Sequence, residues 1–220
     1  MQGYDLNAKL KVEEVDGFEM VKKMAGDAFV MMQQKIDAVK RMKELAENLA
    51  LDHKFDSERG ERLKAGRYSY ANAKKMNVLP EDDDGGGDKY ERYLSMFRNY
   101  SDSRYAPGYV RMVLTANKHF SGIPVNTSET SVHVPTSVND AEPRVINAID
   151  WSSGYWLTDV FKDNYERDPS LSFQYFGSST GFLLQYPAVK WPVNKDMPDM
   201  YDARMRDWYA KASASEKVTR

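Results

Sequence analysis

The chain has 220 residues, of which 41% are hydrophobic and 29% charged, enough to bury a core in one or two domains. It has no cysteine, three scattered histidines and a net charge of -2. This composition excludes cysteine-based zinc sites, thiol catalysis, disulfide frameworks and a global basic field for nucleic acid. The mean hydropathy of -0.68 and the lack of a run of about 18 apolar residues argue against a membrane span.

The first predicted element is one continuous amphipathic helix over residues 16–52. Apolar residues recur at steps close to 3.6, strong helix formers dominate and no proline intervenes. This stripe consists of Val21, Met24, Ala28, Met32, Ile36, Val39, Leu45 and Leu49. At about 1.5 Å per residue the helix would span roughly 50 Å. We expect the stripe to pack against a core, with a coiled-coil partner as the alternative.

The helix belongs to an N-terminal helical region over residues 1–80, and a linker and strand region over residues 81–130 follows. The linker contains an acidic and then glycine-rich run from Glu81 to Asp88. This run lacks the alternating acidic ligands and the terminal glutamate of a calcium-binding EF-hand loop, so we interpret it as a solvated loop.

Residues 131–215 read as helix, then hairpin, then loop, then another strand. Ser152 or Ser153 is expected to cap a helix that carries Tyr155, Trp156, Val160 and Phe161 on one side and ends near Asn164. Two aromatic and aliphatic runs, 173–176 and 182–186, flank a Gly/Ser turn and predict a β-hairpin that Pro187 closes. His133 is interpreted as a strand residue, because no carboxylate cluster near it completes a metal site.

Arg204 and Arg206 stand two residues apart, directly before Trp208 and Tyr209. A guanidinium pairs bidentately with a carboxylate, and aromatic rings beside it exclude water. This pattern therefore predicts a carboxylate-binding site.

No enzyme signature accompanies this predicted site. The turn Gly177 to Gly181 lacks the Gly-Lys-Ser/Thr end of a phosphate-binding loop, and the chain has neither a G-x-S-x-G elbow nor a cysteine nucleophile. We interpret the chain as non-enzymatic.

Longer strings in the second half of the chain resemble one family. They read DWS from Asp150, DPSLSFQYFGSSTGF from Asp168, QYPAVKW from Gln185 and YDARMRDWY from Tyr201. They resemble the α2δ auxiliary subunits of voltage-gated calcium channels, just before the von Willebrand factor A (VWA) domain of that family. The likeness is continuous over about 131–217, and a looser likeness runs back through residues 70–74 to the long helix at the start. The spacing of Tyr201, Arg206, Trp208 and Tyr209 also resembles the amino-acid-binding signature of double-Cache domains.

The resemblance implies an α+β fold in which the long N-terminal amphipathic helix precedes part of a Cache (PAS-like) antiparallel sheet with flanking helices. Residues 131–215 would form the VWA N-terminal and partial Cache region, and residues 216–220 the truncated entry to a VWA domain. We therefore expect a fragment, a truncated gene model or a short isoform, with a complete small cytosolic protein as the alternative. The amino terminus does not have the pattern of a signal peptide.

The resemblance also implies a ligand pocket in which Arg206 anchors the carboxylate of a free amino acid or a gabapentinoid. The other implied pocket residues are Tyr201, Trp208, Tyr209, Trp191, Phe173 and Tyr175. The alternative interpretation makes the tryptophans and Phe173 ordinary core and Arg206 a surface residue. Three positions depart from ligand-binding members of the family, namely Phe173, Gln185 and Met205. The acids that receive the ligand's ammonium lie after the VWA domain in the family.

The function implied by the resemblance is that of a non-enzymatic auxiliary subunit at the extracellular face of the plasma membrane. Its partner would be the pore-forming channel subunit, and it would support channel surface expression and gating. The sequons at Asn99 and Asn126 would then be glycosylated. No cofactor is expected in this chain, because the family's Ca²⁺ site lies in the VWA domain of a longer form. The alternatives are a double-Cache amino-acid sensor of a receptor and a VWA-type adhesion protein.

Overall fold

The computed structural model describes residues 16–58, 70–74, 76–79, 111–140, 142–153, 155–191 and 201–215. Its helices are α1 (Gly17–Asp52), α4 (Pro143–Ser153), α5 (Tyr155–Arg167) and α6 (Asp207–Ser215), with the 3₁₀ turns η2 (Lys118–Phe120) and η3 (Ala203–Met205). Its strands are β1 (Asn77–Leu79), β2 (Arg111–Val113), β3 (Thr115–Ala116), β4 (Pro124–Asn126), β5 (Ser131–His133), β6 (Gln174–Gly177), β7 (Leu183–Tyr186) and β8 (Ala188–Val189). The acidic loop 81–88, the sequon at Asn99 and residues 216–220 lie outside the described residues.

Helix α1 confirms the continuous helix that the sequence predicts over residues 16–52. Asp16 caps it, because a carboxylate oxygen of Asp16 accepts hydrogen bonds from the backbone N–H groups of Phe18 (2.9 Å) and Glu19 (3.4 Å). Within the described residues, no helix is long and apolar enough to cross a membrane.

The stripe predicted to pack against the core is largely wrong. Val21 and Val39 are 65% and 58% exposed, whereas the buried residues of α1 are Ala38 and Ala46. Met42 and Leu45 pack beside Ala46 against the core, so only the second half of the helix is buried, and on a neighbouring face. The small side chains of these alanines let α5 approach α1 closely. The prediction was based mainly on large apolar residues, so it did not include Ala38 and Ala46.

The sheets confirm the α+β class, although the strands are divided among several small sheets. Strands β5, β7 and β6 form one antiparallel sheet with β7 in the centre, and β3, β4 and β8 form a second. Strands β1 and β2 pair in parallel. Strands β6 and β7 are the predicted hairpin, and Pro187 ends β7 as expected. The assignment of this arrangement to the Cache fold stays a prediction.

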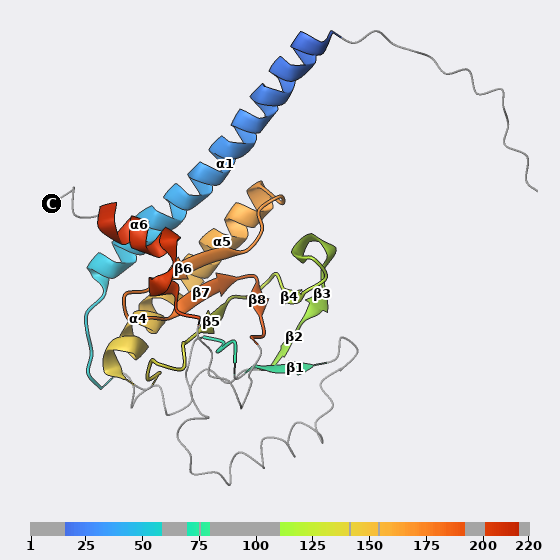
Figure 1. Ribbon diagram of the computed structural model, residues 1–220. Helices are drawn as coiled ribbons and strands as arrows, with labels where there is room; N and C mark the ends of the chain where they lie inside the picture. Colours follow the sequence, from blue (N-terminus) through green and yellow to red (C-terminus); the bar gives the residue numbers. More distant parts are fainter. Residues whose placement is uncertain are drawn as a thin grey trace, which may run out of the picture.

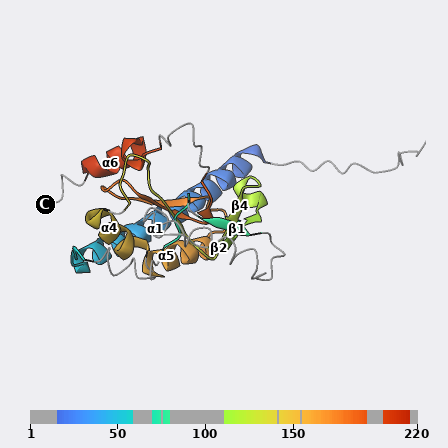
Figure 2. The same cartoon turned by 90° about the horizontal axis from the view of Figure 1, so that it is seen from below.

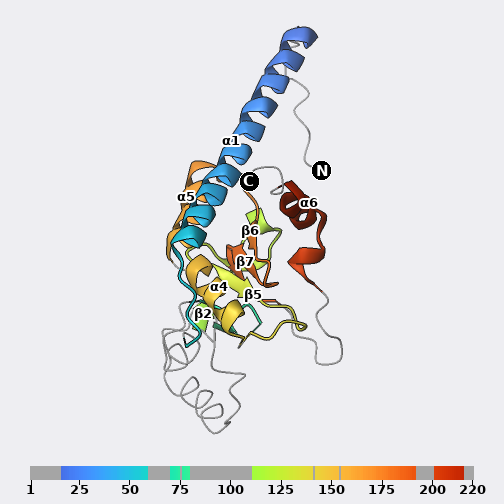
Figure 3. The same ribbon diagram turned by 90° about the vertical axis from the view of Figure 1, so that its left-hand side faces the viewer.

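The β5–β7–β6 sheet lies between two layers of helix (Figures 1, 2 and 3). Helices α1, α4 and α5 cover one face, and η3 and α6 lie over the other. Alternate residues of the strands, such as Val132 and Leu184, point into the helical layer and join the main core. That core also contains Ile149 of α4 and Phe161 of α5, both fully buried. The opposite face of the sheet is left to the C-terminal segment. Residues 201–215 form η3 and α6 there, so the strand expected after the loop is wrong.

The helix predicted after Ser153 is present as α5, but its N-terminal cap and its buried face differ from the prediction. Ser152 and Ser153 belong to the last turn of α4, where their hydroxyls donate to the carbonyls of Ala148 (2.7 Å) and Ile149 (2.6 Å). Helix α5 continues three residues past Asn164, to Arg167. Trp156 is exposed while Phe161 is buried, because five residues separate positions by about 140° around a helix.

Asn164, which is fully buried, joins α1, α5 and β6. Its carbonyl oxygen accepts from Nε of Arg41 (2.7 Å). Its amide nitrogen donates to the Ala38 carbonyl (3.2 Å) and to Oε1 of Gln174 (3.0 Å). Gln174 in turn donates to the Phe161 carbonyl (2.9 Å). A single side chain therefore fixes two helices and one strand relative to one another.

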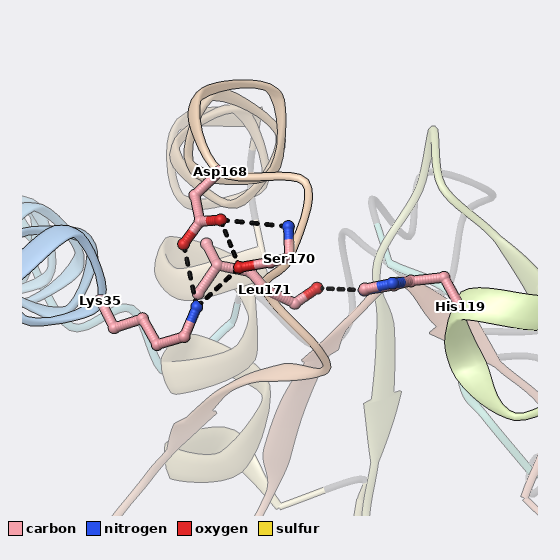
Figure 4. A network of polar contacts seen from close by, with 5 residues as sticks. All are labelled: Lys35, His119, Asp168, Ser170 and Leu171. Carbon is pink, nitrogen blue, oxygen red and sulfur yellow. Dashed lines mark hydrogen bonds and ion pairs between the residues drawn. The ribbon is translucent and has the colours of Figure 1, made fainter. Parts of the chain in front are cut away.

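A second polar network ties α1 to the turn that follows α5 (Figure 4). The Lys35 ammonium contacts Oδ2 of Asp168 (3.0 Å) and the Ser170 hydroxyl (2.9 Å). The Ser170 hydroxyl also donates to Asp168, and this bond first, then Lys35, lowers the pKa of Asp168 against the opposing effect of burial. Nearby, Nε2 of His119 lies 2.7 Å from the Leu171 carbonyl. Because Lys35 meets Asp168 while Arg41 meets Asn164, α1 and α5 run antiparallel.

Replacing Asn164 by alanine should lower the free energy of unfolding by roughly 2–4 kcal/mol, because it leaves Gln174 and the Ala38 carbonyl without their buried partner. Urea denaturation followed by circular dichroism measures this loss. Arg167→Ala is the matched control on the same helix, since its pair with Asp163 is exposed and should matter by less than about 1 kcal/mol. Equal stabilities of the two variants would contradict the role of Asn164.

Candidate functional site

All seven residues of the predicted pocket lie in the described part of the chain. Phe173 directly precedes β6, Tyr175 lies in β6, and Trp191 follows β8. Tyr201, Arg206, Trp208 and Tyr209 come from the segment that contains η3 and the first turn of α6. Figure 3 shows that this segment lies over the face of the β5–β7–β6 sheet that faces away from α4 and α5.

The centre of this face is a stack of three rings. The rings of His133 and Trp191 lie 4.0 Å apart between centroids, and those of Trp191 and Tyr201 lie 5.0 Å apart, edge to face. Nε1 of Trp191 donates to Oε1 of Gln185 (2.9 Å), which fixes the indole on the sheet. The buried His133 and Gln185 thus form the floor on which Trp191 and Tyr201 rest.

Arg206 extends this stack outward. Its guanidinium carbon lies 4.3 Å from the centroid of the Tyr201 ring, a cation–π contact. The side chain is exposed, and among the described residues it makes no ion pair. The N–H groups of Arg206 therefore point to no protein carboxylate in the described structure, and an anion could accept them.

Arg204 is committed to a different contact. Its guanidinium forms a fork with Asp202, with Nε 3.0 Å from Oδ1 and Nη2 2.6 Å from Oδ2. These hydrogen bonds lower the pKa of Asp202, which also accepts from the backbone N–H of Arg204 and caps η3. The pair of arginines in the sequence thus separates into one structural residue, Arg204, and one available residue, Arg206.

Trp208 and Tyr209 lie against Gly177 at the end of β6. A Cβ atom at Gly177 would lie 2.8 Å from Cη2 of Trp208 and 3.2 Å from Cδ2 of Tyr209. Only a residue without a side chain allows α6 to approach this closely. The two rings are edge to face at 6.0 Å, and Trp208 stays partly exposed.

Phe173 and Tyr175 lie at the start of β6. Phe173 packs on Phe120 at 5.0 Å beside a separate apolar cluster that contains Val125 and Val189, and its ring also stacks on that of Tyr175 at 6.2 Å, so its place in the pocket stays a prediction. Tyr175 is partly exposed, and its burial first, then the nearby Tyr201 hydroxyl, raise the pKa of its phenol. Tyr175 therefore borders the site on the side of Tyr201.

Four residues of the site were not predicted as its members: His133, Gln185, Asp202 and Gly177. His133, Gln185 and Gly177 share the sheet face with Tyr175, because the register pairs Tyr175 with Gln185 and His133 with Leu183. The two-residue alternation of the strands is the signal that could have placed them together. Asp202 is an aspartate directly before a short helical turn, which is the sequence signal of an N-cap. This signal indicates a helix start and does not indicate a ligand site.

Two other features bear on the site. In the stretches that the structure describes, no three His, Asp or Glu side chains come together as potential metal ligands. A cleft of about 330 Å³ opens elsewhere, and its lining consists of Thr127, Ser128, Lys162, Tyr165, Glu166 and Tyr186. None of the predicted ligand residues lines this cleft, so the predicted site is a partly open surface and not this hollow.

Comparison with known proteins gives consistent results along the chain. The model of the VWA N-terminal family matches residues 46–191, from the second half of α1 to Trp191. Voltage-dependent calcium channel subunit alpha-2/delta-3 of Homo sapiens and of Rattus norvegicus are each 36% identical over 206 residues, which is 94% of this chain. Subunit alpha-2/delta-4 of Homo sapiens is 36% identical over 213 residues, or 97% of the chain. The chain spans 16% of the length of each of these relatives.

Substituting alanine for Gly177 should push α6 away from the sheet, because the new methyl group would clash with the Trp208 ring. We expect a loss of about 1–3 kcal/mol in stability and a red shift of tryptophan fluorescence. Gly26→Ala in α1 is the control, since nothing lies within 4 Å of its Cβ position and alanine favours a helix. An unshifted emission maximum in Gly177→Ala would show that α6 does not dock as described.

Proposed function

The chain belongs to the VWA N-terminal family and corresponds to the N-terminal region of α2δ subunits of voltage-dependent calcium channels. We propose on this basis that it acts as part of a non-enzymatic auxiliary subunit. The observation that carries the proposal is the 36% identity to alpha-2/delta-3 over 94% of the chain. Identity of this extent covers α1, the sheets and α4–α5 together, and not one short motif.

The proposed partner is the pore-forming subunit of a calcium channel, contacted at the extracellular face of the plasma membrane. The role is to support surface delivery and gating of that subunit. Support comes from the alpha-2/delta relatives, which are named as voltage-dependent calcium channel subunits. A protein named voltage-dependent calcium channel unc-36, of Caenorhabditis elegans, is also 31% identical over 47% of this chain.

The chain should co-purify with a pore-forming subunit when both are expressed in the same cells, with the chain directed to the secretory pathway by an added signal sequence. Calcium current density at the surface should rise relative to cells that secrete an unrelated domain of similar size. Asn164→Ala, which disturbs the joint of α1, α5 and β6, serves as the destabilised comparison. A folded chain that neither co-purifies nor changes the current would refute the proposed role.

We further propose that Arg206 anchors the carboxylate of a free amino acid or of a gabapentinoid in the longer protein. Its guanidinium is exposed, rests on Tyr201 and makes no ion pair among the described residues, whereas Arg204 is held by Asp202. Trp191 lies 5.0 Å from the Tyr201 ring, and Trp208 and Tyr209 follow Arg206 in the first turn of α6. Their aromatic surface would limit the access of water to the ligand. The family's ammonium-binding acids are expected outside this chain, so the chain alone should bind weakly.

Arg206→Ala in the longer protein should weaken amino-acid or gabapentinoid binding by roughly 1.5–3 kcal/mol, the value of a hydrogen-bonded charged pair. Isothermal titration calorimetry measures the change. Arg206→Lys should recover only part of the affinity, because an ammonium cannot pair bidentately. Arg204→Ala should have the smaller effect of the two alanine variants. If Arg206→Ala binds as the unsubstituted protein does, Arg206 is a surface residue.

Asn126 is the proposed glycosylation site that the structure describes. It ends β4, and its side-chain oxygen accepts from the backbone N–H of Ser128 (2.8 Å), the third residue of its own sequon. This bond uses only the side-chain oxygen of Asn126. The side-chain nitrogen, to which a glycan is attached, takes no part in it. Ser128 is exposed and Asn126 partly exposed, as a modified loop requires.

Secreted chain should migrate faster on a gel after glycosidase treatment. Asn126→Gln should remove the contribution of this site, and Ser128→Ala should do the same while keeping the asparagine. Ser128→Thr is the control, because it preserves the sequon and should still shift. Identical mobility of Asn126→Gln and the unsubstituted chain before treatment would mean that Asn126 carries no glycan.

A further inference from the structure

The first half of α1 extends beyond the rest of the described structure (Figures 1 and 3). It exposes a dense set of large apolar side chains. Residues 17–32 of this helix are all exposed. The exposed apolar side chains on α1 from its start to Val39 are Phe18, Met20, Val21, Met24, Phe29, Val30, Met31, Met32, Ile36 and Val39. Soluble proteins rarely expose a contiguous apolar surface of this extent unless something binds it.

Six of these side chains form one straight seam together with Ala25 and Ala28. The six are Phe18, Val21, Phe29, Met32, Ile36 and Val39, and Ala28 and Phe29 stand at the middle of the seam. The steps of three, four and seven residues keep these positions on one side of the helix. The large seam residues are between 46% and 76% exposed. The core contacts of α1 come from Ala38, Met42 and Ala46 on the neighbouring face, so among the described residues none of the buried core residues lies on the seam.

We propose that this seam is the interface between two copies of the chain, paired as antiparallel helices. A two-fold axis between Ala28 and Phe29 places residue numbers that sum to 57 opposite each other. Phe18 then faces Val39, Val21 faces Ile36, and Ala25 faces Met32. At the first and last of these contacts a larger side chain meets a smaller one, the alternation that lets facing helices interdigitate.

The size of the seam suits a dimer of chains. Burying large apolar side chains at this degree of exposure would remove on the order of 600 Å² from water per copy. A standard stable interface buries roughly 800 Å² per partner, so the seam supplies most of that area before any contact between the bodies.

The charges beside the seam do not oppose this pairing. Lys22 is close to Glu19 (3.6 Å) and Lys40 to Asp37 (3.8 Å), both on the same helix. Lys43, where the seam ends, pairs with Glu47 at 2.8 Å. The cations next to the seam therefore carry their own counter-charges, and the antiparallel arrangement sets the two bodies at opposite ends of the paired helices.

The oligomeric state of the 220-residue chain tests the proposal. Sedimentation equilibrium should show a dimer that dissociates on dilution. Met32→Lys should raise the dissociation constant by about tenfold or more, because it places an unpaired charge in the seam. Val30→Lys is the matched control, since Val30 is a similarly exposed apolar residue of α1 outside the seam. A monomer at all concentrations, or equal effects of both substitutions, would overturn the proposal.

Cysteine cross-linking tests the antiparallel register, because the chain has no native cysteine. A mixture of the Val21→Cys and Ile36→Cys chains should give a covalent dimer with a short bismaleimide. Val21→Cys alone should not, because the two cysteines would be about 22 Å apart along the helix axis. A covalent dimer of Val21→Cys alone would show a parallel pair, and no product from either sample would show that the seam is not paired; both results overturn the proposal.

Discussion

The buried amide of Asn164 is the contact on which the arrangement of the fold depends. A side chain with no access to water must find all its hydrogen-bond partners inside the protein, and Asn164 finds them in Arg41, the Ala38 carbonyl and Gln174. These partners belong to α1 and β6. The same side chain therefore fixes the position of α1 along α5 and the position of β6 relative to both helices. Lys35 and Asp168 tie α1 to the chain a second time, six residues before Arg41 and four residues after Asn164.

With α1, α4 and α5 held on one face of the sheet, the other face is free to carry the site. Its floor is fixed by His133 and by Gln185, which holds the Trp191 indole. Above that floor the packing loosens, so that Arg206 rests on Tyr201 without a carboxylate partner among the described residues. A rigid floor under an exposed guanidinium suits the binding of a small anion. The side chains of the floor are already fixed, so binding would cost little further conformational entropy.

The sequence predicted the elements better than their contacts. The long helix, the hairpin and the end of β7 at Pro187 follow from local periodicity and turn chemistry, and all three were correct. The packed face of α1 was not, because it is defined by Ala38 and Ala46, whose small size marks a close helix contact only once the partner is known. The different fates of Arg204 and Arg206 likewise depend on Asp202, which local spacing cannot distinguish from a surface acid.

The central claim is that the sheet face opposite α4 and α5 is the binding face, and hydrogen exchange measured by mass spectrometry on the longer protein tests it most directly. Adding a free amino acid should slow exchange in residues 201–209 and in β6, and leave α1 unchanged. The N-acetylated methyl ester of the same amino acid, which lacks both charges, should have no effect. Protection confined to the cleft beside Tyr165, or none within residues 201–209, would contradict the account.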